Sequence, residues 1–135
     1  MQGTQKAAPL ILASTYQQIM LYELKGVERH KGEPKRKWFV DDEIDLCVWF
    51  DEQDNIIGFQ LVYDKSIDIH ALTWQDNKGF SHNRVVDDPW HLPNTLVADG
   101  LFENDRVATI FKNQAKEIDS ELSDFVYKKL LEYKV

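Results

Sequence analysis

The chain has 135 residues, of which 43% are hydrophobic and 12% aromatic, and its formal net charge is −7. This apolar content excludes a disordered chain and is sufficient for one folded domain. The negative charge argues against general affinity for nucleic acid or an anionic membrane, and no apolar stretch is long enough for a transmembrane helix. The single cysteine excludes an internal disulfide and a cysteine-rich zinc module, and it favours a cytoplasmic location.

The first part of the chain carries the weakest signals. Residues 1–15 contain a short apolar patch behind a single lysine, which does not suffice for a signal peptide. We therefore expect a disordered leader, followed by one domain at residues 16–135. Residues 16–29 fit either a helix or a strand, and Gly26, which suits a bulge, favours a strand that joins the sheet.

Residues 38–74 predict three consecutive antiparallel strands, because their apolar residues recur with a period of two. Pairing Val48 with Phe59 keeps one face apolar, whereas a slip of one residue would mix the two faces. In this register the indole of Trp49 covers Gly58, which has no side chain. The other predicted pairs are Phe50 with Ile57, Leu61 with Leu72, Phe59 with Trp74, and Tyr63 with His70. The predicted core comprises Leu46, Val48, Phe59, Leu61 and Leu72.

The rest of the chain predicts a long loop and then helices. Residues 75–94 contain many turn formers, so we expect a loop around a short strand near residues 80–86, followed by a short strand at 96–98. Two amphipathic stripes predict helices, one capped by Asn104 or Asp105 and the other by Asp119 or Ser120. The predicted fold class is α+β, an antiparallel meander of three to five strands covered on one face by two C-terminal helices.

The middle of the chain contains strings rich in aromatic residues and aspartates. They are Trp38-Phe39-x-Asp41-Asp42, Asp45-Leu46-x-Val48-Trp49-Phe50-Asp51, Gly58-Phe59-Gln60-Leu61-x-Tyr63-Asp64-Lys65, Ala71-Leu72-Thr73-Trp74 and Gly79-Phe80-Ser81-His82. These strings resemble a group of short, uncharacterised bacterial proteins. The chain departs from their pattern at Pro89, where a glycine usually follows the Asp-Asp pair. The resemblance implies a bacterial, soluble, single-domain protein, and it implies no activity.

Gln60 is the sharpest polar candidate for ligand binding. In the predicted register it lies mid-strand on the second face of the sheet, between Cys47 and Thr73. Together with Trp49 it forms a mixed apolar and amide surface of the kind that lines a ligand site. The alternative is that a helix or loop covers Gln60, which then bonds a backbone group. The predicted binding residues are Trp49, Gln60, Thr73 and His82.

Two of the four histidines are candidates for catalysis. His70 and His82, with Asp87 or Asp88, have the side chains of an acid–base or metal site. The histidines lack a metal-binding spacing such as H-x-x-x-H, so we predict no metal site. We expect instead that His70 packs beside Tyr63 and that His82 lies in a partly exposed loop.

The remaining polar segments predict structural roles. Residues 41–45 form an acidic cluster that we interpret as a solvated loop, which supplies partners to the basic segment at residues 29–37. Cys47 lies inside a predicted strand, so we predict that it is a buried, structural thiol. The sequence contains no glycine-rich phosphate loop, nucleophile elbow or Walker-type string, and we predict no cofactor.

The leading functional hypothesis is a non-enzymatic ligand-binding or protein-interaction domain of the bacterial cytoplasm. It would hold an unidentified small molecule or protein on the second sheet face or on the loop at residues 80–91, and it would bind neither nucleic acid nor membrane. The alternative is a small enzyme that uses His70, His82 and Asp87 in acid–base or metal roles. Convergence of these three side chains in a cleft would favour the enzyme.

Overall fold

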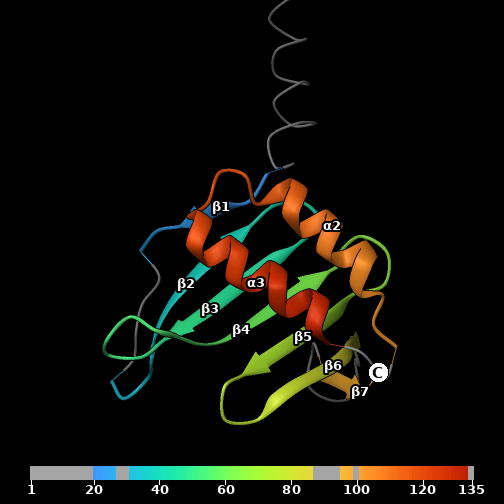
Figure 1. Ribbon diagram of the computed structural model, residues 1–135. Coiled ribbons are helices and arrows are strands. Elements are labelled where there is room, and N and C mark those ends of the chain that lie inside the picture. The colour runs from blue at the N-terminus through green and yellow to red at the C-terminus, as the bar shows by residue number, and fades with distance from the viewer. Residues whose placement is uncertain (1–19, 27–30, 87–94, 99–100, 134–135) are drawn as a thin grey trace, which may run out of the picture.

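The computed structural model describes residues 20–26, 31–86, 95–98 and 101–133. Figure 1 shows two helices lying side by side across one face of a twisted sheet. The strands are β1 (Tyr22–Leu24), β2 (Lys35–Val40), β3 (Asp45–Phe50), β4 (Ile56–Tyr63), β5 (His70–Gln75), β6 (Gly79–Val86) and β7 (Thr95–Ala98), and the helices are α2 (Asn104–Gln114) and α3 (Ser120–Glu132).

The described strands form one sheet of seven, in the order β1-β2-β3-β4-β5-β6-β7, and each pairs antiparallel with its neighbours. The predicted α+β class is therefore confirmed, with more strands than the three to five expected. Within the described part of residues 16–29, the chain forms strand β1, as the sequence analysis favoured, and not a helix. Strand β2 was not predicted, because its first three residues, Lys35, Arg36 and Lys37, are all charged and hide the alternation.

The predicted register of the central strands is confirmed, with one local exception. Val48 pairs with Phe59, Trp49 with Gly58, Leu61 with Leu72, Phe59 with Trp74, and Tyr63 with His70. Phe50, however, pairs with Ile56 rather than Ile57, because a bulge interrupts the ladder after Trp49. The turn beyond it is closed by Asp51, whose carboxylate accepts the N–H groups of Gln53 and Asn55 at 2.9 Å. These bonds, chiefly those from Asn55, lower the pKa of Asp51.

The core lies between the sheet and the two helices. The predicted core residues are fully buried, and the helices contribute an apolar stripe opposite them. As predicted, Asp119 caps α3 by accepting the N–H of Leu122 at 3.0 Å. Helix α2 begins at Asn104 itself, so that Glu103 occupies its N-cap position. The helical side chains in the core are Val107, Ala108, Phe111, Leu122, Val126 and Leu130.

Asp41 corrects the interpretation of residues 41–45 as a solvated loop, because it is only 4% exposed. One of its carboxylate oxygens accepts the N–H groups of Glu43 and Ile44, both at 2.8 Å. The other accepts the side-chain amide of Gln114 at the end of α2. Gln114 also accepts the N–H of Leu21 at 2.9 Å through its backbone carbonyl. Asp41 and Gln114 thus tie the first strands to the helical layer.

The charged segments also pair differently from the prediction. Lys35 in β2 forms an ion pair with Asp54, in the turn after β3. Arg36 lies 3.8 Å from Glu33, and Asp45 of the acidic cluster pairs with Lys65 at 2.6 Å. These contacts differ from the predicted pairing of the two charged segments with each other.

Candidate functional site

The side chains predicted for function lie on opposite faces of the sheet. Trp49, Gln60 and Thr73 are on the second face, away from the helices, whereas His70 and His82 are on the helix-covered face. Asp87, Asp88 and the end of the predicted loop at residues 80–91 lie outside the described residues. The two groups are therefore separate candidate sites.

The second face carries a groove of about 440 Å³ that crosses strands β2 to β6. We call it the second-face groove. Its buried floor includes Cys47 and Ala71, and its walls are half-buried side chains. The lining residues are Arg36, Trp38, Asp45, Cys47, Trp49, Gln60, Val62, Lys65, Ile69, Ala71 and Val85.

Strand register explains why these residues meet. Cys47 pairs with Trp38 on one side and with Gln60 on the other, so that the three cross neighbouring strands in one row. Gln60 pairs in turn with Thr73, and its Nε2 donates to Thr73 Oγ1 at 3.0 Å. Thr73 does not line the groove itself, but it orients the side-chain amide of Gln60, which does. The prediction that Gln60 lies between Cys47 and Thr73 is confirmed.

Gly58 allows the indole of Trp49 to lie against the sheet, as predicted. A Cβ atom at Gly58 would lie 3.2 Å from Cε3 of Trp49 and 2.9 Å from the backbone oxygen of Trp74. The second distance is below any ordinary contact and involves backbone, which cannot move away without disturbing the ladder. The glycine therefore makes room both for the neighbouring strand and for one wall of the groove.

Charged side chains lie at both ends of the groove. At one end, Lys65 donates to the carboxylate of Asp45 at 2.6 Å and to the carbonyl of Asp41 at 2.8 Å, so that opposite charges compensate each other. At the other end, the guanidinium carbon of Arg36 lies 5.9 Å from the ring centre of Trp38. The indole N–H of Trp38 is buried and has no hydrogen-bond partner among the described residues.

Cys47 is a poor nucleophile despite its place in the groove. Burial raises its pKa from 9.0 to about 11, an effect that the nearby charge of Arg36 only partly offsets. The thiol is therefore neutral at physiological pH, in agreement with the predicted structural role.

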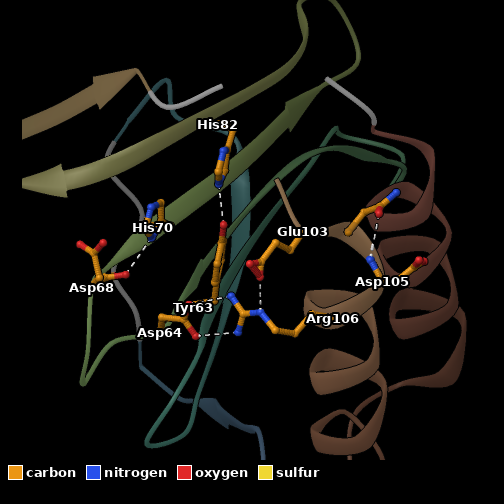
Figure 2. A network of polar contacts seen from close by, with 9 residues as sticks. Tyr63, Asp64, Asp68, His70, His82, Glu103, Asp105 and Arg106 are labelled. Carbon is orange, nitrogen blue, oxygen red and sulfur yellow. Dashed lines mark hydrogen bonds and ion pairs between the residues drawn. The ribbon is translucent and has the colours of Figure 1, made fainter. Parts of the chain in front are cut away.

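His82 corrects the prediction of a partly exposed loop residue. It lies in β6, pairs with Leu72 and is only 5% exposed. Its Nε2 lies 2.5 Å from the phenol oxygen of Tyr63, and the two rings are nearly parallel (Figure 2). The predicted short strand near residues 80–86 is confirmed by β6, and pairing with β5 places every second residue of it, His82 included, on the core face.

His70 packs beside Tyr63 as predicted, with ring centres 5.5 Å apart. It lies at the same distance from His82, and its Nδ1 is 2.7 Å from the carbonyl oxygen of Asp68. Phe102 contacts both Tyr63 and His82 edge-on. We call Tyr63, His70 and His82 the ring stack.

Arg106 of α2 closes the ring stack beside Tyr63 (Figure 2). Its guanidinium donates to both carboxylate oxygens of Asp64, at 3.1 and 2.8 Å, and to Glu103 at 2.7 Å. These two carboxylates raise the pKa of Arg106 further above its usual value, so that it stays charged. No group of three His, Cys, Asp or Glu side chains suited to a metal ion occurs among the described residues.

Comparisons of the chain with protein-family models, with curated proteins and with solved structures found no match. The resemblance to a group of short bacterial proteins therefore stays a prediction. Within the described residues, no helix is long and apolar enough to cross a membrane.

Proposed function

We propose that this protein is a non-enzymatic binding domain that holds a small, largely apolar molecule in the second-face groove. The observation that carries the proposal is a groove of about 440 Å³ with two tryptophan walls and a glutamine amide near its middle. Small-molecule sites typically measure roughly 300–1,000 Å³ and combine apolar walls with a few placed polar groups.

The composition of the second face supports this proposal. An antiparallel sheet that packs helices on one face usually presents polar side chains on the other. Here the second face presents Trp38, Trp49 and Val62 in the middle of the sheet, with Ile69 and Val85 farther along. Contiguous apolar surface outside the core commonly marks a binding site.

The concave shape favours a small molecule over a protein partner. The floor formed by Cys47 and Ala71 is buried, whereas the tryptophan walls beside it are half-buried. A flat protein surface would leave this depression unfilled, and a compact organic ligand would fill it. A second copy of the chain or another protein is therefore an alternative outcome of the test below.

A thermal-shift screen with a groove-filling variant tests the proposal. Val62→Trp would occupy the groove, and Ser81→Trp is the matched control, since Ser81 is exposed on strand β6 of the same sheet and does not line the groove. We expect some members of a library of organic acids, amides, amines and nucleosides to stabilise the wild type and Ser81→Trp but not Val62→Trp. A ligand at 100 times its Kd stabilises a protein by about 2.7 kcal/mol, which such a screen detects easily.

Two results would contradict this function. One is a library that stabilises none of the proteins. The other is equal stabilisation of the wild type and Val62→Trp. If size-exclusion chromatography shows a dimer that Val62→Trp abolishes, the groove face is an interface between copies of the chain.

The second candidate function is the small enzyme, and the convergence of His70, His82 and Tyr63 is the observation in its favour. The burial of His82 argues against it, because a substrate would have to displace packed rings to reach the imidazole. A metal-dependent enzyme predicts that Zn²⁺ raises the melting temperature of the wild type but not of His82→Gln. With each protein compared to its own metal-free state, we expect no such difference.

A further inference from the structure

The side-chain amide of Gln60 is the polar group best placed to bind a ligand in the second-face groove. Its Nε2 donates one of its two N–H groups to Thr73 Oγ1 at 3.0 Å. The second N–H and the carbonyl oxygen Oε1 form no hydrogen bond within the part of the chain that the structure describes. Gln60 is half-buried and lines the groove, and its amide, unlike the indole N–H of Trp38, is not enclosed by the protein. One donor and one acceptor are therefore open to an occupant.

Small residues on both sides of Gln60 leave room for an occupant beside this amide. Cys47 lies directly opposite Gln60 on β3, and Ala71 on β5 lies one row of side chains away, opposite Val62. Cys47 and Ala71 are buried and line the groove. Neighbouring strands are about 4.8 Å apart, so the backbone of Trp38, which pairs with Cys47 on its other side, is about 10 Å from that of Gln60. A flat ring over Cys47 would meet the indole of Trp38 at one edge and the amide at the other.

The charges in the groove already have partners, which favours a neutral ligand. Lys65 pairs with Asp45 at 2.6 Å. Arg36 pairs with Glu33 at 3.8 Å. Burial raises the pKa of the Cys47 thiol to about 11, which shows that the floor disfavours charge. A charged head group would lose its hydration over this floor and would compete for cations that are already paired.

From these observations we infer that the groove binds a neutral aromatic amide, either a carboxamide or a lactam, whose C=O and N–H pair with the open N–H and Oε1 of Gln60. An amide carries a donor next to an acceptor, and these are the two partners that Gln60 leaves open. The aromatic body follows from the indoles of Trp38 and Trp49, because aromatic rings prefer to stack on or meet the edge of one another. This inference rests on the proposed small-molecule function and specifies its ligand class.

Titration calorimetry with three quinoline probes tests the head group of the ligand. Quinoline-3-carboxamide, 3-acetylquinoline and quinoline-3-carboxylate share one aromatic body, and their head groups have nearly the same shape. The carboxamide offers a donor and an acceptor, the ketone only an acceptor, and the carboxylate acceptors with a negative charge. We expect the wild type to bind the carboxamide roughly 3- to 10-fold more tightly than the ketone, the range for one neutral hydrogen bond. The carboxylate should bind most weakly.

Replacing Gln60 locates the head group. Gln60→Met keeps the length of the side chain but cannot form either hydrogen bond, so the ratio of carboxamide affinity to ketone affinity should fall to about one. Gln75→Met is the matched control, because Gln75 is a half-buried glutamine on the same face, in β5, and does not line the groove. In that variant the ratio should stay at the wild-type value.

Gln60→Glu tests the same position by a gain of binding, which a misfolded variant cannot produce. This change keeps the shape of the side chain and replaces its amide by a carboxylate. The cationic probe 3-(aminomethyl)quinoline should therefore bind Gln60→Glu roughly 10-fold more tightly than the wild type, as expected for one charge-assisted hydrogen bond.

Equal affinity of the wild type for the carboxamide and the ketone, or tighter binding of the carboxylate, would overturn the inferred ligand class and leave the small-molecule function intact. A ratio that Gln60→Met retains, or that Gln75→Met also loses, would overturn the position of the head group, and so would the lack of a gain in Gln60→Glu. Binding of octanamide as tight as that of quinoline-3-carboxamide would overturn the aromatic body. If none of the probes binds, the inferred ligand class is wrong, and the library screen above decides the proposed function separately.

Discussion

Replacing Tyr63 by phenylalanine tests whether the ring stack is a structural unit. The change removes only the phenol oxygen, which lies 2.5 Å from Nε2 of His82. Both residues are buried, so neither group regains a water molecule easily. An unsatisfied buried polar group costs about 1–3 kcal/mol, and we expect Tyr63→Phe to lose that much unfolding free energy.

Urea unfolding followed by tryptophan fluorescence measures this loss. For a chain of this size, each 1 kcal/mol corresponds to roughly 3–5 °C in melting temperature, which gives an independent check. The matched control is Tyr22→Phe, since Tyr22 is also in a strand but is 44% exposed. That variant should stay within about 0.5 kcal/mol of the wild type, as surface substitutions usually do.

A double-mutant cycle separates the hydrogen bond from ring packing. His82→Phe should also be destabilising, because it leaves the phenol of Tyr63 without the imidazole. The double variant Tyr63→Phe/His82→Phe should lose less than the sum of the two, since it removes both ends of this hydrogen bond together. A loss in Tyr63→Phe no larger than in Tyr22→Phe, or strict additivity in the cycle, would refute this reasoning.

Three further predictions concern the sheet. Phe59→Ala, at the fully buried centre of β4, should cost about 3–5 kcal/mol, and a loss below about 1 kcal/mol in urea unfolding would contradict the face assignment. Gly58→Ala should be destabilising, because the new Cβ would lie 2.9 Å from the backbone oxygen of Trp74. An unchanged urea midpoint would show that the sheet accommodates this Cβ without loss of stability. Because burial raises the pKa of Cys47 from 9.0 to about 11, the unfolded chain loses its thiol proton first, so stability should fall as the pH rises between these values. In Cys47→Ala, this fall in unfolding free energy at alkaline pH should be smaller. An identical dependence of stability on pH in both proteins would show that ionisation of Cys47 is not its cause.

The sequence was most informative where one local pattern recurs. Period-two alternation in β3, β4 and β5 is a property of each strand alone, and only one register matches all the apolar faces. That register placed Trp49 against Gly58 and Gln60 between Cys47 and Thr73, and both placements are confirmed. The apolar stripes of the two helices and the cap at Asp119 also depend only on residues close together in the sequence, and the structure confirms them.

Predictions failed where a residue's environment depends on distant parts of the chain. The charged residues at the start of β2 hide its alternation, and only pairing with β3 makes this segment a strand. Asp41 resembled an exposed carboxylate, but the end of α2 covers it and supplies the amide of Gln114. His82 lay among turn formers, and its burial follows from the pairing of β6 with β5 and from the cover of Phe102.

By itself, then, the sequence determined the α+β class, the core face and the second-face residues of β3, β4 and β5. It could not determine which polar groups on either face are buried or whether the second face is concave. Those properties depend on which elements lie over each strand and on how neighbouring strands twist past one another. The groove and the ring stack exist only after long-range pairing brings β2 to β6 and α2 into one structure, and no local pattern encodes that arrangement.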